Sequence, residues 1–371
     1  MFTNKTKKSF LKAILTKKAP IYVQFAVTKN CNLRCEMCDS NSSRENEVEL
    51  NLKEIEKLTD VLDKLNTGVV LLTGGEPFLR KDITEIIRLF ASKGFTVRLQ
   101  SNGWFADESA IKDAYNAGMN EITISLDSLD PEKHDSIRGT RGSWQKAIES
   151  IARFSQILPA QGTFLGINTV VCKKNLDEIT SIIRFVTEIG FFSSLIPVHL
   201  ANSDSDFIIR KEAPELAFQP TDFDKIDEVY KEILKMKKDG FNIFNSRLFL
   251  EKSPSFLKGQ RVKWHCDSPN LYFAISPSGK FLPCVDLKTS ISMLDDNFVK
   301  VYRSKEFKTR IQQMVNSCPG CFYACWPEMS FLCRNFSVLA ERIILGMKTS
   351  FKKRKPVTYE DCIKIIDRIK K

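Results

Sequence analysis

The sequence lacks the features that would place this chain in a membrane or in a secretory pathway. It has no run of about 18 apolar residues, the length that a membrane-spanning helix requires. Its N-terminal segment is basic throughout and has no small-residue cleavage site after an apolar core, so it does not predict a signal peptide. No internal repeat stands out. These absences predict a globular, cytoplasmic protein.

Cysteine, by contrast, is plentiful. The chain has 371 residues, 43% of them hydrophobic, and 11 cysteines. A chain of this length can bury a substantial core and is typical of two domains. Cysteines in a reducing compartment stay free of disulfides and are available to bind metal. The composition therefore favours a metal or iron-sulfur protein over a disulfide scaffold.

The net charge of +11 lies mostly at the two ends of the chain. Residues 1–18 carry six lysines and no acidic side chain, and residues 346–371 carry nine basic and three acidic ones. A nucleic-acid enzyme more often carries its positive charge along a groove of the folded domain. The pattern therefore does not favour nucleic acid as a partner, and it indicates two basic arms.

The N-terminal arm is also amphipathic. Between residues 7 and 18, one helical face would hold four apolar side chains with lysines around them: Phe10, Leu11, Ile14 and Leu15. Such a segment can bind an anionic membrane surface or an acidic peptide. The commoner arrangement, which we expect here, is a lysine-bordered helix packed on the domain by its apolar side.

Three cysteines, Cys31, Cys35 and Cys38, stand in a C-x3-C-x2-C arrangement. The β-branched run at 21–29 predicts a strand, so the cysteines lie on a loop at its carboxyl end, where α/β folds place active sites. Three thiolates can hold a four-iron cluster and leave one iron open for chemistry. On spacing alone, a zinc site and a chance cluster remain alternatives.

A second motif, Gly74-Gly75-Glu76-Pro77, follows the apolar run 69–72 and precedes a predicted helix at 82–92. A glycine pair at a strand end exposes backbone groups to a ligand. Glu76 adds a carboxylate that can pair with an ammonium group. The motif therefore predicts a ligand site beside the cysteine loop.

With these two motifs at this separation, the chain resembles the radical S-adenosylmethionine (SAM) enzymes. The resemblance implies that the open iron chelates the amino and carboxylate groups of SAM and that the Gly-Gly-Glu turn holds the methionyl ammonium. It also implies that reductive cleavage of SAM yields a 5'-deoxyadenosyl radical. The electron donor would be an external reductase or a flavodoxin-type protein.

Further positions resemble residues around SAM in this family. Four follow predicted strands: Ser101, Asn102, Ser125 and Asp127. Arg138 resembles an arginine that some members place near the SAM carboxylate. Met37 departs from the family, which often has an aromatic residue before the third cysteine; methionine is polarizable and can pack on a ring instead. As isolated residues, the polar ones would be turn and capping groups.

Strand and helix patterns alternate along the first half of the chain. Predicted strands cover residues 21–29, 69–72, 96–100, 121–124, 163–171 and 192–200, and predicted helices cover 52–65, 82–92, 106–117, 143–157 and 176–189. Such units predict a parallel α/β sheet with right-handed crossovers. The resemblance implies a partial, open (β/α)6 barrel with the cluster at its top.

Cysteines return beyond a charged helical connector at 221–240. A hairpin pattern at 272–282 lies between Cys266 and Cys284, and Cys318 and Cys321 follow. This layout resembles the Twitch and SPASM auxiliary-cluster domains, although the seventh cysteine and the C-x2-C-x5-C-x3-C block of a full SPASM domain are absent. We expect these four cysteines to bind one auxiliary four-iron cluster, with a second cluster or a structural zinc as alternatives.

Cys325 and Cys333 are left without an assignment. Either is an alternative cluster ligand or a free catalytic thiol that donates a hydrogen atom to a substrate radical, as in some epimerases of the family. Cys172 and Cys362 are expected to be small buried side chains. His134 and His265 have no spacing that suggests a ligand pair.

The patterns divide the chain into five expected segments. These are a basic N-terminal arm (1–19), the barrel (20–225), a helical linker (226–260), the auxiliary-cluster domain (261–335) and a basic C-terminal helical tail (336–371).

The expected function is radical abstraction of hydrogen from a peptide or natural product, leading to oxidation, crosslinking or epimerisation. No leader-peptide-binding domain fits before residue 20, so a peptide substrate would need a partner protein or the basic arms. The first alternative is a radical dehydrogenase or epimerase that acts on a small molecule, such as a sugar, an aminoglycoside or a lipid-linked compound. The second is a non-catalytic iron-sulfur electron carrier or a zinc-stabilised scaffold.

Overall fold

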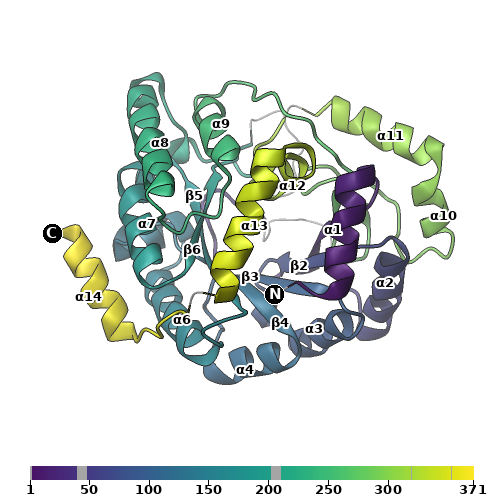
Figure 1. Cartoon of the computed structure of the whole chain (residues 1–371), viewed down its shortest axis with the longest axis horizontal. Helices are drawn as coiled ribbons and strands as arrows, with labels where there is room; N and C mark the ends of the chain where they lie inside the picture. The colour runs from purple at the N-terminus through teal and green to yellow at the C-terminus, as the bar shows by residue number, and fades with distance from the viewer. Residues whose placement is uncertain (1, 40–47, 202–209, 319, 352) are drawn as a thin grey trace.

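A computed structural model of the chain describes residues 2–39, 48–201, 210–318, 320–351 and 353–371. Its centre is a sheet of eight strands in the order β6-β5-β4-β3-β2-β1-β7-β8 (Figure 1). The strands are β1 (Tyr22–Thr28), β2 (Val69–Gly74), β3 (Thr96–Ser101), β4 (Met119–Ser125), β5 (Phe164–Val171), β6 (Phe192–Pro197), β7 (Tyr272–Ile275) and β8 (Phe281–Leu282). Neighbouring strands pair in parallel except β7 and β8. The predicted parallel α/β barrel is confirmed.

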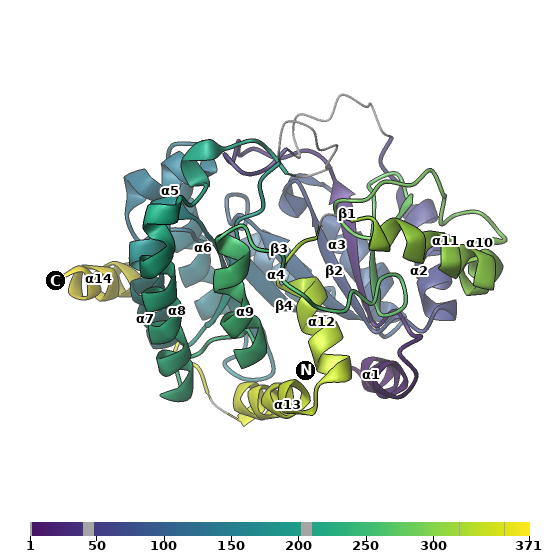
Figure 2. The same cartoon turned by 90° about the horizontal axis from the view of Figure 1, so that it is seen from above.

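Helices connect successive strands and cover the outer face of the sheet (Figure 2). They are α2 (Leu52–Lys64), α3 (Ile83–Ser92), α4 (Glu108–Asn116), α5 (Pro131–Arg138), α6 (Ser143–Ile157) and α7 (Ile179–Glu188). Local sequence sets where they begin: Asn51 and Glu54 form a reciprocal capping box at α2, and Asp107 caps α4. The short α5 was not predicted, because it is rich in charged residues and has little apolar periodicity.

The two faces of β1 show how the sheet separates core from site. Val23, Phe25 and Val27 are fully buried in the main hydrophobic cluster beneath the helices. Burying one such side chain contributes about 1.5–3 kcal/mol. Because successive side chains of a strand point to opposite faces, the residues between them, Gln24 and Ala26, face the barrel interior and line its cavity.

The C-terminal region continues the same sheet. Its elements are α8 (Phe223–Lys238), α9 (Arg247–Leu257), β7, β8, α10 (Phe298–Arg303), α11 (Lys305–Asn316), α12 (Cys325–Arg334), α13 (Phe336–Phe351) and α14 (Tyr359–Lys370). The predicted hairpin is present as β7 and β8, and β7 pairs with β1 through Tyr272 and Tyr22. The auxiliary region is therefore joined to the barrel by backbone hydrogen bonds.

Both basic ends pack on the rest of the chain, although two apolar side chains at the N-terminal end stay exposed. In α1 (Asn4–Thr16), the buried face consists of Thr6, Ser9 and Ala13, while Leu11 and Leu15 are 59% and 72% exposed. The expectation that this helix packs by its apolar side is therefore wrong for those two leucines. At the other end, α14 contributes buried Cys362 to the main hydrophobic cluster, so it is not a free arm.

None of the helices in the described part of the chain has the length and the apolar character needed to span a bilayer.

Candidate functional site

The loop after β1 brings Cys31, Cys35 and Cys38 to the wall of one cavity. Burial, together with the neighbouring Cys35 and Cys38 thiols, raises the pKa of Cys31 to about 11, because negative charges this close repel one another. Bound iron would reverse that preference and hold all three as thiolates. No fourth cysteine and no histidine occurs between Cys31 and Leu50, so this loop offers three thiolate ligands.

Gly74 and Gly75 allow the end of β2 to lie directly against the cysteine loop. A Cβ on Gly75 would lie 2.0 Å from the carbonyl oxygen of Asn30, and one on Gly74, whose φ is +134°, would lie 2.2 Å from that of Thr28. The Gly75 amide donates a 2.8 Å hydrogen bond to the Thr28 carbonyl. Both positions therefore require glycine, and the backbone of both lines the cavity.

The sequence predicted that the Glu76 carboxylate pairs with the ammonium group of a ligand, but the structure gives it other partners. Its carboxylate is fully buried and is not among the groups that line the cavity. It accepts hydrogen bonds from the Ser101 hydroxyl (2.8 Å), the Asn102 amide (2.7 Å) and the Phe78 amide (3.1 Å). Burial nevertheless raises its pKa to about 7. In this geometry Glu76 fixes the Gly-Gly turn against the end of β3, while the glycine backbone faces the cavity.

Polar residues at the ends of β3 and β4 lie near the cysteine loop; their contact with the ribose of SAM stays a prediction. The Asn102 side-chain amide lies 3.8 Å from the sulfur of Cys31 and donates a 3.0 Å hydrogen bond to Asn32. Ser101, Ser125 and half-buried Met37 line the same cavity, and Met37 also packs against the main hydrophobic cluster.

Arg138, at the end of α5, links the cysteine loop to β4. Its Nε lies 2.7 Å from Oδ2 of buried Asp127, and its Nη1 lies 3.8 Å from the sulfur of Cys35. Asp127 also accepts a 2.8 Å hydrogen bond from the Val170 amide. The ion pair orients the guanidinium, one edge of which faces the cavity.

The cavity itself has a volume of about 850 Å³ and spans the barrel interior and the C-terminal region. One wall carries the three cysteines and the strand ends. Cys325, Glu328 and Met329, in the first turns of α12, line the same cavity. Helix α12 therefore forms part of the cavity wall.

A buried ion pair in this barrel was missed from the sequence. Arg98 and Glu121 are opposite each other on β3 and β4, and Arg98 Nε donates a 2.6 Å hydrogen bond to Glu121 Oε2. Arg98 lines the cavity, with its guanidinium carbon 5.9 Å from the rings of both Phe164 and Phe244. One charged residue within each of two neighbouring apolar strands was the signal that could have revealed the pair.

The C-terminal region gathers Cys266, Cys284, Cys318 and Cys321. Burial is the main cause that raises the pKa of Cys321, and nearby Cys284 and Cys266 raise it as well. Cys318 raises the pKa of both Cys266 and Cys284. These cysteines therefore lie near one another, and their assignment as one ligand set stays a prediction.

Cys325 and Cys333 lie in different environments. The Cys325 sulfur accepts a 3.1 Å hydrogen bond from the Gln24 side chain, lines the cavity, and has a pKa raised to about 12 by burial. Cys333 is buried in the second hydrophobic cluster, where α1, α12 and α13 meet. Cys172 and Cys362 are fully buried, which confirms that expectation.

His199, which the sequence did not single out, connects the barrel to the auxiliary cysteines. Its Nε2 accepts a 2.8 Å hydrogen bond from the Phe322 amide, beside Cys321, and its ring stacks on Tyr323 at 3.7 Å. Both rings line the cavity. By contrast, His134 accepts a hydrogen bond from the Asp127 amide, and His265 lies 3.5 Å from Asp267.

In the described part of the chain, no three His, Cys, Asp or Glu side chains are arranged to hold a single metal ion. The thiolates of an iron-sulfur cluster bind different irons, whereas those of a zinc site all contact one ion at about 2.3 Å.

Comparison with known proteins places the barrel in a family. Residues 25–186 match the Radical SAM superfamily. An AdoMet-dependent heme synthase of Methanosarcina barkeri is 28% identical over 59% of this chain and 60% of its own length. One from Nitratidesulfovibrio vulgaris is 24% identical over 81% and 84%, and the GTP 3',8-cyclase of Aquifex aeolicus is 34% identical over 45% and 53%. The chain thus spans less than two thirds of the first and third of these relatives.

Two solved structures share the fold over most of the chain. SuiB of Streptococcus suis, bound to its precursor peptide SuiA, superposes with a TM-score of 0.59 at 17% identity, covering 82% of this chain and 70% of that one. The enzyme anSMEcpe with bound AdoMet, which is SAM, gives 0.60 at 15% identity, covering 94% and 96%.

Proposed function

We propose that this chain, of which residues 25–186 match the Radical SAM superfamily, cleaves SAM reductively and abstracts hydrogen from a peptide or natural-product substrate. A four-iron cluster with SAM, when bound, would supply the 5'-deoxyadenosyl radical. The observation that carries the proposal is that three thiols, a glycine backbone, polar strand ends and Cys325 line one cavity.

In this proposal the cysteine loop, the Gly-Gly turn and the polar strand ends each have a distinct task. Cys31, Cys35 and Cys38 would hold the cluster as thiolates. The backbone of Gly74 and Gly75 receives the methionyl ammonium, since the Glu76 carboxylate is occupied by Ser101 and Asn102. Asn102 and Ser125 offer hydrogen bonds to the ribose.

Arg138 is placed to receive the SAM carboxylate. Its pairing with Asp127 fixes the guanidinium in one orientation, so little side-chain entropy is lost when the carboxylate binds. The surrounding walls exclude water and align SAM with the substrate, which is a positioning effect.

The cavity must hold the cofactor and the reacting part of the substrate together. At about 850 Å³ it has room for a side chain or a small molecule beside SAM, and a longer peptide would extend outside it. SuiB, which shares this fold, was solved with a precursor peptide. This likeness supports a peptide substrate.

The Cys325 thiol favours a second candidate function, epimerisation. It lines the same cavity as the cysteine loop, so it is placed to reach a substrate radical formed there. The S–H bond of Cys325 would break and a C–H bond would form on the substrate. The resulting thiyl radical would then take one electron from the external donor and one proton from solvent. Cys333 is buried away from the cavity and is not placed for this step.

We also propose that Cys266, Cys284, Cys318 and Cys321 bind one auxiliary four-iron cluster. Neighbouring cysteines of this set raise the pKa values of Cys321 and Cys284, which supports their proximity and this ligand set. His199 and Tyr323 line the cavity, and His199 accepts a hydrogen bond from the Phe322 amide beside Cys321, so the cluster would lie near the cavity wall, where it could accept an electron from the substrate or help bind it.

The test is anaerobic reconstitution with iron and sulfide, followed by addition of dithionite and SAM. The proposal predicts 5'-deoxyadenosine. A fully loaded cluster without cleavage would favour the non-catalytic electron carrier instead.

Substitution separates the two candidate activities. Cys325→Ala should leave SAM cleavage intact but abolish the incorporation of solvent deuterium into product if the thiol returns the hydrogen. Cys333→Ala serves as the control, and equal deuterium incorporation in both variants would exclude epimerisation through Cys325.

A further inference from the structure

A cationic hollow lies between α1 and α2, far from the catalytic cavity. It has a volume of about 410 Å³ and is lined by Lys5, Lys8, Ser9, Lys12, Asp63 and Asn66. The hollow borders the amino ends of the strands, because the Thr6 hydroxyl of α1 donates a 2.7 Å hydrogen bond to Gly68, just before β2. The catalytic cavity occupies the carboxyl ends.

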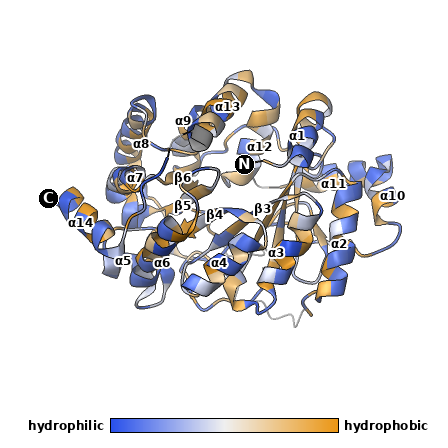
Figure 3. Ribbon diagram, turned by 60° about the horizontal axis from the view of Figure 1, so that its bottom comes forward, coloured by the Kyte–Doolittle hydropathy of each residue, from blue (hydrophilic) through white to orange (hydrophobic). Residues whose placement is uncertain are grey.

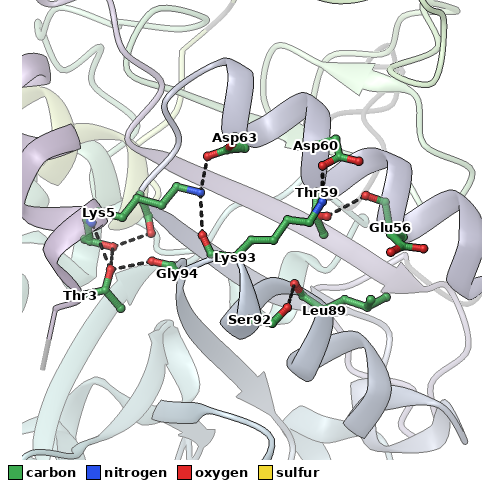
Figure 4. Close-up of polar contacts among 12 residues, drawn as sticks. Thr3, Lys5, Glu56, Thr59, Asp60, Asp63, Leu89, Ser92, Lys93 and Gly94 are labelled. Atoms are coloured by element: carbon green, nitrogen blue, oxygen red, sulfur yellow. Dashed lines mark hydrogen bonds and ion pairs between the residues drawn. The ribbon is translucent and has the colours of Figure 1, made fainter.

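Polar contacts hold α1 in this place, and the nearby aspartates are paired with lysines (Figure 4). The Thr3 hydroxyl donates to the Gly94 carbonyl at 2.6 Å. Lys5 Nζ pairs with Asp63 at 2.8 Å and donates to the Lys93 carbonyl at 3.1 Å, and Asp60 pairs with the Lys93 side chain. Lys8 and Lys12, both exposed, therefore give the hollow its net positive charge.

An apolar ridge runs beside the hollow. Because α1 packs through Thr6, Ser9 and Ala13, its opposite side presents Leu11 and Leu15 to solvent. Large exposed apolar side chains on neighbouring turns are uncommon in a soluble protein without a binding partner.

Helix α13 extends the same face. Four of its apolar side chains are more than half exposed: Phe336, Ile343, Ile344 and Met347. Figures 1 and 2 show α1 and α13 together on one side of the molecule, and Ala13 of α1 and Val338 of α13 share a buried cluster with α12. Both apolar and polar residues appear along these helices in Figure 3. We call the six exposed side chains, with Lys8 and Lys12, the α1/α13 face.

We propose that the α1/α13 face docks on an anionic phospholipid membrane. The exposed leucines and the apolar residues of α13 enter the headgroup boundary, and the lysine hollow takes a lipid phosphate. Residues 1–18 contain six lysines and no acid, so two copies of this face would repel each other, which argues against self-association. Docking in this orientation leaves the carboxyl ends of the strands, and the catalytic cavity, turned away from the lipid. The inference does not depend on the proposed chemistry.

Flotation of the full-length protein with liposomes tests the proposal. We expect binding to vesicles of phosphatidylcholine with phosphatidylglycerol, at least tenfold weaker binding to phosphatidylcholine alone, and progressive release as salt rises. Lys8→Glu with Lys12→Glu should abolish binding, and Leu11→Ser with Leu15→Ser should reduce it at least tenfold. These side chains are exposed, so thermal unfolding should be unchanged.

The charge-matched control is Lys231→Glu with Lys364→Glu, two exposed lysines on α8 and α14. This variant should bind like the wild type. If the control variant loses vesicle binding to the same extent, binding depends only on net charge and the proposal is wrong. Vesicle binding that survives both the lysine and the leucine substitutions would also overturn it. A solution dimer that Leu11→Ser with Leu15→Ser dissociates would identify a second copy as the occupant, and capture by an acidic peptide without vesicle binding would identify a protein partner; either contradicts it.

Discussion

The Ser101 hydroxyl donates a 2.8 Å hydrogen bond to the Glu76 carboxylate, and both side chains are almost completely buried. This bond joins the Gly-Gly turn after β2 to the end of β3. Neither partner can turn toward a ligand without breaking it. The arrangement assigns Glu76 to holding the site in shape.

Glu76 should make stability depend on pH. Burial raises its pKa from 4.5 to about 7, so between these values the folded chain keeps a proton that the unfolded chain has released. Stability therefore falls as pH rises through this window. Relative to Glu76→Gln, the metal-free wild type should lose roughly 3 kcal/mol of unfolding free energy between about pH 4.5 and pH 7. Urea unfolding measures this, and parallel pH profiles of the two proteins would contradict the assignment.

Gly75→Ala should displace the cysteine loop. The added Cβ would lie 2.0 Å from the Asn30 carbonyl oxygen, a backbone atom that cannot rotate away. We expect a destabilisation of about 1–3 kcal/mol and a marked loss of bound iron at the three-cysteine site. Gly346→Ala is the matched control, because nothing lies within 4 Å of its Cβ. Equal iron content in both variants would disprove the close-approach argument.

The Arg98–Glu121 pair gives a prediction about the barrel interior. Arg98→Met leaves the Glu121 carboxylate, whose side chain is 7% exposed, without its partner and should destabilise the chain by about 3–5 kcal/mol. Adding Glu121→Leu removes the stranded charge, so the double variant should recover most of that loss. Chemical unfolding of the three proteins checks the order. A double variant less stable than Arg98→Met would show that the pair is not an isolated unit.

Replacing Cys31, Cys35 and Cys38 together by alanine should remove about four irons per chain and abolish SAM cleavage. The iron bound at the C-terminal cysteines should remain, because the two groups lie on different segments. Cys362→Ala, a buried cysteine outside both groups, should keep all the iron. Iron analysis and the yield of 5'-deoxyadenosine measure these outcomes, and loss of all iron from the triple variant would contradict two separate sites.

The strand and helix pattern was predictable because each element shows its own apolar period, as α6 does over Ser143–Ile157. The cysteine triplet and the Gly-Gly turn were also predictable, since their chemistry depends on local spacing. The pairing of β7 with β1 was not, because either edge of a sheet offers the same backbone groups.

The sequence also did not predict the roles of Glu76 and Arg98. The Glu76 carboxylate turns inward because Ser101 and Asn102, more than twenty positions away, offer it donors. The Arg98–Glu121 pair depends on the register between β3 and β4. Both follow from strand alignment, which one sequence does not specify. The exposure of Leu11 and Leu15 likewise arises because α1 meets the barrel through small residues.

The central claim is that Cys31, Cys35 and Cys38 leave one iron of their cluster open for SAM. The most direct measurement is electron-nuclear double resonance of the reduced protein, with SAM labelled at its amino nitrogen with ¹⁵N. The account predicts a nitrogen coupling to the cluster that disappears in the triple cysteine variant. A fully loaded cluster that shows no such coupling and keeps a fourth protein ligand in the presence of SAM would contradict it.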